Sequence, residues 1–424
     1  MPIDLPRGTR DYGTQEAIAL NDIIRKIESS FRRFGFSPID TPAMENLDVI
    51  NAKAYGDETR KEIYTLDNGE SGLRFDLTVP LARYMAMNKD LPLPFKRYQI
   101  GKTWRKEEPQ HMRYREFIQA DVDIVGSSEL SSDAEVIAAA AVALESLGID
   151  SYRIMINSRV VLNAILDYFG IPKERQTQAI RAIDKLEKTG RNEVAKALTG
   201  MGIEGNRCEE LLSFVTNNVD NEEKLRRVEG SIPAAKEEID RLRQLLKILE
   251  SYKMLGLAFV DLSLARGLDY YTGFVWEFVV FQNEKRLPTI VAGGRYDNLI
   301  GVYSKRQLPA VGTSIGVSRI VGLVNGSDKR RSYADVFIGC IGGEVRDYAI
   351  NVAGRLRAAG ICTDLDITGR SISKQLEYAS SIGIGKVIII GKMEKDASRV
   401  KLRDMDTGIE DILDIDSVIS RLRA

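Results

Sequence analysis

Apolar side chains recur at helical spacing near the start of the chain. Between residues 16 and 34 they fall three or four positions apart, at Ile23, Ile24, Ile27, Phe31 and Phe34. This spacing predicts an amphipathic helix, because residues three and four apart share one helix face. Gly35 ends the pattern, and two prolines, Pro38 and Pro42, then flank a segment expected to be extended.

Two later segments alternate with a period of two, which is typical of strands. Between residues 73 and 79, Leu73, Phe75, Leu77 and Val79 share one face, and Arg74, Asp76 and Thr78 share the other. Between residues 115 and 124, Arg115, Phe117, Gln119, Asp121 and Asp123 oppose an apolar face. One packed face and one polar face predict an antiparallel sheet whose polar side lines a ligand site.

The rest of the chain separates into regions of different composition. Residues 132–147 predict an Ala-rich helix, and residues 160–255 predict charged helices. In that region Ile239, Leu242, Leu245, Leu246 and Leu249 form one apolar stripe, which favours a helix packed in its own small domain over a partner-binding coiled coil. Strand-like sequence returns at 274–292. After a polar linker at 325–331, predicted strands (336–340, 386–390) alternate with helices (345–359, 372–382), which indicates a separate α/β domain.

Length and composition narrow the class of protein. A chain of 424 residues is expected to form two or three domains. With 44% hydrophobic residues, no apolar run near 18 residues and no N-terminal leader pattern, we expect a soluble cytosolic protein that does not enter the membrane. Cys208, Cys340 and Cys362 lie far apart, which suits a reducing compartment and gives no zinc-site spacing.

The single histidine, His111, excludes most catalytic schemes that depend on histidine. The string from Gly312 to Gly316 matches the hydrolase pattern G-x-S-x-G, but no histidine follows it. Neither a P-loop nor a G-x-G-x-x-G segment is present. A net charge of −1 gives no general attraction for nucleic acid, although seven basic residues lie between Lys96 and Arg115: Lys96, Arg97, Lys102, Arg105, Lys106, Arg113 and Arg115. Alone, such a run is more often a solvated surface.

Several segments resemble the histidine-specific branch of the class II aminoacyl-tRNA synthetases. Residues 105–117 (RKEEPQHMRYREF) resemble the strand–loop–strand motif 2, and 312–319 resemble motif 3. Residues 266–271 (RGLDYY) and 292–297 (AGGRYD) resemble the two segments that distinguish this branch. Residues 5–11 resemble its N-terminal opening, and 34–42 the motif 1 dimerisation segment. The resemblance covers nearly the whole chain in family order.

This resemblance implies an activity and a set of site residues. The expected reaction activates L-histidine with ATP and transfers it to the 3′ end of histidine tRNA, with Mg²⁺ on the phosphates. Arg105 and Arg266 correspond to catalytic arginines near the α-phosphate, and Arg319 to the arginine against adenine and the γ-phosphate. Glu107 corresponds to an ATP-side or metal ligand. In-line attack on phosphorus requires fixed cations, and these arginines would supply them.

Histidine binding falls by resemblance to a second group of residues. Asp76 and Thr78 match the residues that hold the α-amino group, and Arg113 and Gln119 match carboxylate and amino contacts. Asp123, Tyr271 and Tyr296 would bind the imidazole, and Tyr270 would lie in the same site. The whole histidine site would then consist of Asp76, Thr78, Arg113, Gln119, Asp123, Tyr270, Tyr271 and Tyr296. Carboxylates and phenols can pair with both ring nitrogens.

The sequence departs from many family members at three places. Glu108 replaces a basic residue, His111-Met112 replaces a frequent Lys-Gly, and Asp76 and Asp123 replace the longer Glu of some bacterial members. The form DLTVP at 76–80 resembles archaeal and eukaryotic members.

The expected fold is α+β. An antiparallel class II catalytic domain with flanking helices occupies 1–164 and 251–325, a helical insertion occupies 165–250, and a C-terminal α/β anticodon-binding domain occupies 331–424, in a homodimer formed through motif 1. The alternative is a non-catalytic, histidine-sensing regulatory subunit of ATP phosphoribosyltransferase. Retention of Arg105, Arg266 and Arg319 together with the C-terminal domain argues against it.

Overall fold

A computed structural model of the chain describes residues 3–52, 60–66, 69–110, 112–266, 270–283, 285–324 and 331–423. Gly267, Leu268 and Asp269 of the RGLDYY segment, His111 and linker residues 325–330 lie outside the described residues. The chain divides into two compact units. Unit 1 comprises Met1–Arg10 and Ile23–Leu323, and unit 2 comprises Asp11–Asp22 and Val324–Ala424.

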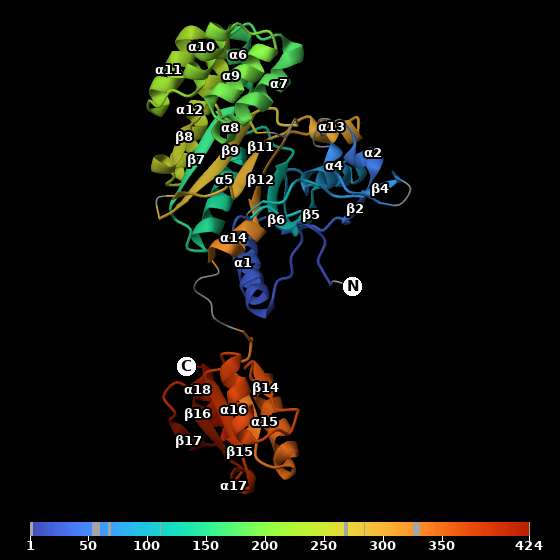
Figure 1. Ribbon diagram of the computed structural model, residues 1–424, viewed down its shortest axis with the longest axis vertical. Helices are drawn as coiled ribbons and strands as arrows, with labels where there is room; N and C mark the ends of the chain where they lie inside the picture. Colours follow the sequence, from blue (N-terminus) through green and yellow to red (C-terminus); the bar gives the residue numbers. More distant parts are fainter. Residues whose placement is uncertain are drawn as a thin grey trace. The chain divides into compact units, whose positions relative to one another are not determined.

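The centre of unit 1 is a large, mostly antiparallel sheet (Figure 1). Its neighbouring strands are, in order, β1 (Ser37–Pro38), β5 (Phe95–Trp104), β6 (Glu116–Val125), β12 (Ala310–Gly316), β11 (Val291–Arg295), β9 (Phe274–Gln282), β7 (Tyr152–Ser158) and β8 (Ala258–Val260), and β10 (Lys285–Arg286) pairs with β9. Among the described strands of this sheet, only the pairs β1–β5 and β7–β8 are parallel. The predicted antiparallel sheet is therefore confirmed, including the strand expected at 115–124.

One face of this sheet is covered by the Ala-rich helix α5 (Leu130–Glu145), close to the range predicted. It packs against β6, β11 and β12. Its alanines are fully buried, because small side chains let a helix lie close to a sheet. None of the α5 residues lines the cleft described below, so the cleft opens on the opposite face.

The strand predicted at residues 73–79 is wrong. Strand β4 (Ser71–Leu73) ends at Leu73, and helix α4 (Thr78–Met87) begins five residues later. Asp76 causes this change, because its Oδ1 accepts hydrogen bonds from the backbone N–H groups of Thr78 and Val79, at 3.1 and 2.9 Å. Proline at position 80 suits the first turn of the helix, where an N–H has no partner to lose.

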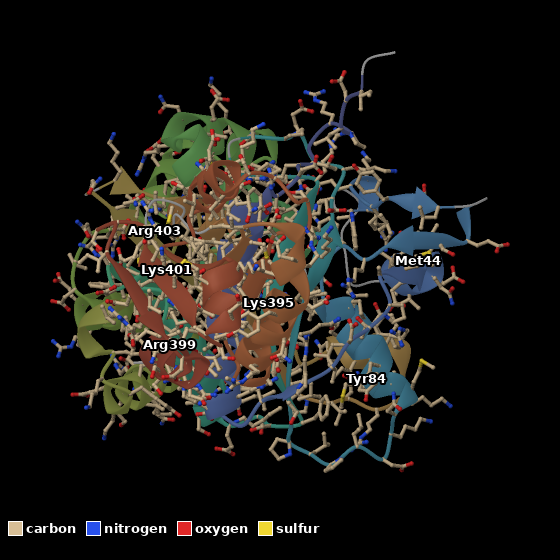
Figure 2. The ribbon with its side chains drawn as sticks, turned by 90° about the horizontal axis from the view of Figure 1, so that it is seen from below. Met44, Tyr84, Lys395, Arg399, Lys401 and Arg403 are labelled. Carbon is tan, nitrogen blue, oxygen red and sulfur yellow. The ribbon has the colours of Figure 1, made fainter. Side chains whose placement is uncertain are left out.

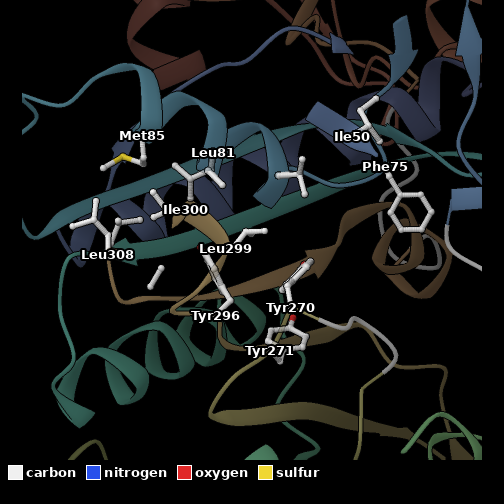
Figure 3. Packing of buried hydrophobic residues seen from close by; sticks show 14 of the residues in the cluster. Ile50, Phe75, Leu81, Met85, Tyr270, Tyr271, Tyr296, Leu299, Ile300 and Leu308 are labelled. Atoms are coloured by element: carbon white, nitrogen blue, oxygen red, sulfur yellow. The ribbon is translucent and has the colours of Figure 1, made fainter. Parts of the chain in front are cut away.

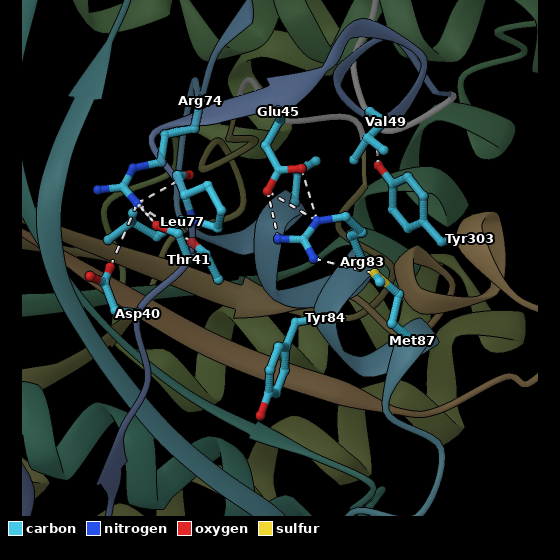
Figure 4. Close-up of polar contacts among 12 residues, drawn as sticks. Asp40, Thr41, Glu45, Val49, Arg74, Leu77, Arg83, Tyr84, Met87 and Tyr303 are labelled. Carbon is cyan, nitrogen blue, oxygen red and sulfur yellow. Dashed lines mark hydrogen bonds and ion pairs between the residues drawn. The ribbon is translucent and has the colours of Figure 1, made fainter. Parts of the chain in front are cut away.

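A small sheet, β2 (Met44–Asn46), β4 and β3 (Thr65–Leu66), lies beside α4, with α2 (Leu47–Ile50) and α13 (Leu299–Tyr303) nearby. Figure 4 shows Arg83 of α4 bound to both carboxylate oxygens of Glu45, at 2.7 to 3.0 Å. Arg74, predicted to face the ligand, is instead buried. It donates to the carbonyl oxygens of Thr41 and Lys102, at 2.6 and 2.8 Å. Arg74 therefore joins three segments and does not line the cleft.

Buried apolar side chains from α4, α13 and the 270–275 segment form one core cluster (Figure 3). The cluster includes Leu81, Met85, Leu299 and Ile300, and it also contains Tyr270, Tyr271 and Tyr296. The three tyrosine rings are thus held by packing on one side, which fixes where their hydroxyl groups point.

Helices dominate the region between β7 and β8, as predicted. They are α6 (Arg159–Tyr168), α7 (Lys173–Asp184), α8 (Leu186–Thr189), α9 (Arg191–Gly200), α10 (Gly205–Val215), α11 (Asn221–Ser231) and α12 (Lys236–Ser251), with 3₁₀ turns at Pro233–Ala235 and Leu255–Leu257 (Figure 1). Four of the five stripe residues in α12 are buried, and α12 packs against α5 of the same unit. The predicted helix is confirmed.

Unit 1 also contains all of α14 (Val317–Val324) except its last residue, and α14 follows β12 directly. Helix α1 (Thr14–Arg33), predicted from its apolar spacing, is confirmed. No helix among the described residues has the length and apolarity that a membrane crossing requires.

Unit 2 has its own five-stranded sheet, in the order β14 (Thr363–Leu365), β13 (Val336–Cys340), β15 (Lys386–Ile390), β16 (Val400–Asp404) and β17 (Glu410–Leu413). The first three strands are parallel, and the others are antiparallel. The helices are α15 (Arg346–Ala358), α16 (Ile372–Ser381), α17 (Lys392–Asp396) and α18 (Ile415–Arg423), with a 3₁₀ turn at Gly343–Val345. The predicted α/β arrangement is confirmed.

Candidate functional site

The register of the main sheet gathers the polar residues into rows. Asp121 lies opposite Gln99 on β5 and Ser314 on β12, and Ser314 in turn lies opposite Ala292 on β11. Two residues along β6, Asp123 lies opposite Arg97 and Gly312. Directly paired residues point to the same face of a sheet, so these rows line one side.

A cleft on this face has two chambers. The inner chamber, of about 270 Å³, is lined by Phe75, Asp76, Thr78, Asp121, Asp123, Tyr270, Tyr271 and Tyr296, and by Arg105, Arg113, Gln119, Arg266, Ala292 and Ser314 at its mouth. The outer chamber, of about 540 Å³, shares these six mouth residues and adds Glu107, Glu277, Arg286 and Arg319, among others. Every site residue predicted from the sequence lines one of the two chambers, so the structure brings all of them together.

Asp123 lines the inner chamber away from the mouth residues, at what we call its closed end, and two partners hold its carboxylate. Its Oδ2 lies 2.8 Å from Arg97 Nη2, and the Tyr296 hydroxyl donates to its Oδ1 at 2.5 Å. Arg97 is fully buried and also donates to the Leu77 carbonyl oxygen at 3.0 Å. A Cβ at Gly312 would overlap the Asp123 carboxylate, so only glycine leaves room there. Gly312 therefore belongs to the middle of β12, and the G-x-S-x-G string is not a hydrolase elbow.

Asp76 and Thr78 lie where β4 gives way to α4. The Oδ1 atom of Asp76 caps α4, and its Oδ2 lies 3.5 Å from the Tyr270 hydroxyl. Burial raises the pKa of Tyr270, and the nearby Asp76 carboxylate raises it further. Tyr270 therefore remains a neutral hydrogen-bonding group at physiological pH.

Asp121 is the residue of this chamber to which sequence reasoning gave no role. It is 2% exposed, and its Oδ1 has no hydrogen-bond partner among the described residues. Burial raises the pKa of Asp121 to about 7. Arg97 opposes this rise, whereas Asp123 adds to it. Its position on the polar face of β6 was visible in the sequence, but its missing partner was not.

The outer chamber is rich in cations. Arg319, in the first turn of α14, donates to the backbone carbonyl oxygen of Thr289. Burial lowers the pKa of Arg319, and repulsion from Arg113 and Arg105 lowers it further. Closely placed guanidinium groups repel one another unless an anion lies between them, which favours a polyanionic ligand in this chamber.

Arg266 stands at the mouth that joins the two chambers. Its Nη1 donates to Glu277 Oε1 at 2.7 Å, and Glu277 Oε2 accepts from the Thr289 hydroxyl at 3.0 Å. Burial lowers the pKa of Arg266, but Glu277 and Tyr271 more than offset this and raise it overall. The residue has a φ of 55°, a left-handed conformation that is uncommon for arginine.

The other mouth arginines come from the loop between β5 and β6. Arg105 lies over the rings of Phe75 and Phe117, at 4.3 and 5.0 Å, and donates to the Phe75 carbonyl oxygen at 3.2 Å. Arg113 donates from Nε to Glu107 Oε2 at 2.6 Å. Both cations are thus oriented before any ligand arrives.

The segment 292–297 acts as a brace. Arg295 on β11 forms a buried ion pair with Asp133 of α5, its Nε lying 3.2 Å from Oδ1. The backbone N–H of Asp297 donates to the Thr272 hydroxyl at 3.0 Å, and the Thr272 N–H donates to the Arg295 carbonyl at 2.8 Å. These contacts fix the chain just after Tyr271.

The departures in the β5–β6 loop have structural counterparts. Met112 has a φ of 59°, at the position where family members often carry glycine, which accepts this conformation more easily. Glu108 forms an ion pair with Arg7, and the Arg115 N–H donates to the Gly8 carbonyl at 2.7 Å. The N-terminal segment therefore supports this loop.

Two family models match the chain, one over most of its length and one over its C-terminal part. The model of the histidyl-tRNA synthetase family matches residues 8–320, and the model of an anticodon binding domain matches residues 335–424.

Individual relatives match along nearly the full length. A histidine–tRNA ligase of Korarchaeum cryptofilum is 38% identical over 99% of this chain and 98% of its own length. One of Aeropyrum pernix is 37% identical over 94% of this chain and 92% of its own. The crystal structure of histidyl-tRNA synthetase from Nostoc sp. PCC 7120 superposes with a TM-score of 0.87 at 28% identity, covering 100% of this chain and 99% of that one.

Proposed function

This chain belongs to the histidyl-tRNA synthetase family, and from that premise we propose how its residues divide the work. The activity is that of a histidine–tRNA ligase, which uses ATP to join L-histidine to its tRNA. Full-length relatives with this activity favour it over a regulatory histidine-sensing subunit.

The observation that carries the proposal is the change of charge across the mouth of the cleft. Carboxylates and phenols line the inner chamber, whereas arginines line the outer one, and Arg105, Arg113 and Arg266 stand between them. An amino acid in the inner chamber and ATP in the outer one would meet at this point. The attacking carboxylate and the α-phosphate are both negative, so fixed cations are needed where they approach.

In the first step, an oxygen of the histidine carboxylate attacks the α-phosphorus and pyrophosphate leaves. Arg105 and Arg266 offset the charge that develops on the α-phosphate oxygens, while Arg319 holds the far end of ATP. Arg113 orients the carboxylate, and this requires it to share or leave its contact with Glu107. Arg105 and Arg266 act without reorganisation, because aromatic rings orient the first and Glu277 orients the second.

In the second step, the terminal ribose hydroxyl of the tRNA attacks the carbonyl carbon of the adenylate, and AMP leaves. The adenylate phosphate oxygen can take the hydroxyl proton, so no general base from the protein is required. The histidine ring is read at the closed end of the chamber by Asp123, Tyr271 and Tyr296. Asp76, Thr78 and Gln119 hold the α-amino group, with Tyr270 supporting Asp76.

We propose that Mg²⁺ enters with ATP and uses Glu107 as its protein ligand. Both contacts of Glu107 with Arg113 use Oε2, which leaves Oε1 for a cation beside the phosphates. Mg²⁺ commonly takes one or two carboxylates and completes its shell with phosphate oxygens and water. Bound there, it would neutralise charge on the leaving pyrophosphate.

The domain boundaries follow as proposals. Residues 1–164 and 251–325 form the catalytic domain, 165–250 the insertion, and 331–424 the anticodon-binding domain. We propose that the protein works in the cytosol as a homodimer whose interface includes residues 34–42. There β1 is an edge strand of the sheet, and the nearby Met44 is 59% exposed. Light scattering of the wild type and Met44→Asp tests the dimer, which the substitution should weaken.

The activity itself is tested by histidine-dependent exchange of labelled pyrophosphate into ATP. Exchange with histidine and with no other standard amino acid supports the proposed substrate. Exchange driven by another amino acid instead contradicts it.

A further inference from the structure

The inner chamber holds three buried carboxylates, from Asp76, Asp121 and Asp123, and two of them are already engaged. Asp123 has Arg97 on one oxygen and Tyr296 on the other. Asp76 uses one oxygen to cap α4 and turns the other toward Tyr270. Neither carboxylate has a free acceptor facing the chamber without giving up a contact of the fold.

Asp121 differs from both. Its carboxylate interacts with the Ser314 side chain through a hydrogen bond, while Oδ1 has neither a hydrogen bond nor an ion pair among the described residues. A buried, unpartnered carboxylate oxygen costs free energy, so its presence in a native protein calls for an explanation, such as a ligand that donates to it. Asp121 lines the chamber, so a ligand bound there lies beside its carboxylate.

The place of Asp121 on β6 indicates which donor that is. It lies two residues beyond Gln119, toward the closed end marked by Asp123 and Tyr296. Two strand residues span roughly 6.6 Å, close to the distance from the α-amino nitrogen of an extended histidine to its far ring nitrogen. If Gln119 holds the backbone end of the amino acid, the ring lies beside Asp121.

We propose that Asp121 is a specificity-determining residue whose Oδ1 accepts a hydrogen bond from the imidazole N–H of histidine. This assignment rests on the proposed function and refines it. Asp123 then acts mainly through Tyr296, whose hydroxyl it orients, and the ring nitrogen without a proton accepts from a phenol. The groups around Asp121 are Arg97, Arg74, Asp123, Asp76, Tyr271 and Ser314. Within this set, Arg97 pairs with Asp123 through Nη2, while its Nε and Nη1 have no hydrogen-bond partner among the described residues, and Arg74 donates to backbone carbonyl oxygens. None of these nitrogens hydrogen-bonds to Asp121 Oδ1.

The test pairs a substitution with a substrate analogue. Pyrophosphate exchange is measured for the wild type, Asp121→Ala and Asp121→Asn, with histidine and with 3-(4-thiazolyl)alanine, whose ring lacks an N–H. If the ring donates to Asp121, Asp121→Ala lowers kcat/KM for histidine by about 10- to 100-fold, the value of one charge-assisted hydrogen bond. The analogue should change by less than about threefold, since it has no N–H to lose. Asp121→Asn preserves the shape and should show an intermediate loss.

Equal losses with histidine and the analogue overturn the assignment, because a contact to the α-amino group or a purely structural role affects both amino acids alike. Asp150→Asn, an exposed change of the same charge, serves as the control and should alter neither. If the wild type shows no exchange with histidine, the proposed function itself fails. That outcome is distinct from equal losses of kcat/KM with histidine and with the analogue, which overturn only the role of Asp121.

Discussion

Arg266 Nη1 lies 2.7 Å from Glu277 Oε1, and this ion pair holds the guanidinium at the mouth of the inner chamber. The backbone of Arg266 has a φ of 55°, which costs about 1 to 2 kcal/mol for a residue with a Cβ. The surrounding contacts offset that cost. The result is a cation oriented toward the place where the carboxylate and the α-phosphate would meet.

Arg266→Ala is expected to affect the reaction far more than binding. Loss of the positive charge that stabilises the transition state should lower kcat for pyrophosphate exchange by about 100- to 1,000-fold. Calorimetry should find the Kd for histidine within about threefold of wild type, because the ring and amino contacts remain. Arg153→Ala, an exposed arginine outside the cleft, is the matched control. A large loss of histidine affinity with unchanged kcat contradicts the role assigned to Arg266.

Gly312→Ala should damage the closed end of the inner chamber. The added methyl group would overlap the Asp123 carboxylate and displace it from Tyr296. Overpacking of this kind costs about 1 to 3 kcal/mol, so Tm should fall and KM for histidine should rise at least about tenfold. Gly205→Ala meets no atom within 4 Å and should leave both unchanged. An unchanged KM for Gly312→Ala speaks against the placement of histidine beside Asp123.

The stability of the free protein should depend on pH through Asp121. Its pKa is raised from 3.8 to about 7 by burial, so the folded protein holds a proton that the unfolded chain loses near pH 4. The stabilisation by this proton is complete below about pH 4, declines as the pH rises, and is absent above about pH 7. Asp121→Asn cannot ionise. Its Tm relative to wild type should therefore increase between pH 5 and 8, by on the order of a few degrees. Scanning calorimetry tests this, and a constant difference across that range contradicts the raised pKa.

Unit 2 presents basic side chains near and along β16, and Figure 2 shows Lys395, Arg399, Lys401 and Arg403 over one face of it. Lys401 and Arg403 are two residues apart on a strand and so point to the same side. If this face contacts tRNA phosphates, Arg399→Ala combined with Lys401→Ala lowers tRNA charging by about tenfold, most strongly at low salt, and leaves pyrophosphate exchange intact. Lys374→Ala, on α16, is the control. Parallel losses of exchange and charging contradict a role confined to tRNA.

Some elements were predictable because a local pattern decided them. Strand β6 follows directly from its alternation of polar and apolar residues, and helix α5 follows from its run of alanines, which are strong helix formers. The segment at 73–79 has the same alternation and is nevertheless a strand end followed by a helix. There Asp76 satisfies two N–H groups at the start of α4, and a capping hydrogen bond outweighs a short pattern.

The sequence indicated which residues line the cleft, but it did not indicate which side chains hold them in place. Resemblance brought Asp123, Arg113 and Glu107 to the cleft as ligand contacts. The structure adds that Asp123 is engaged by Arg97, and Arg113 by Glu107. Arg97 looked in the sequence like one member of a solvated basic run, yet it is fully buried. Such partners come from other strands, and the register that joins them is a property of the fold.

Amino-acid-dependent pyrophosphate exchange tests the substrate and the role of Arg266 most directly, when it is measured for the wild type with each standard amino acid and repeated with Arg266→Ala. We expect strong exchange with histidine alone, and we expect Arg266→Ala to lose this exchange while it still binds histidine. Exchange with a different amino acid, or full exchange by Arg266→Ala, would contradict this expectation.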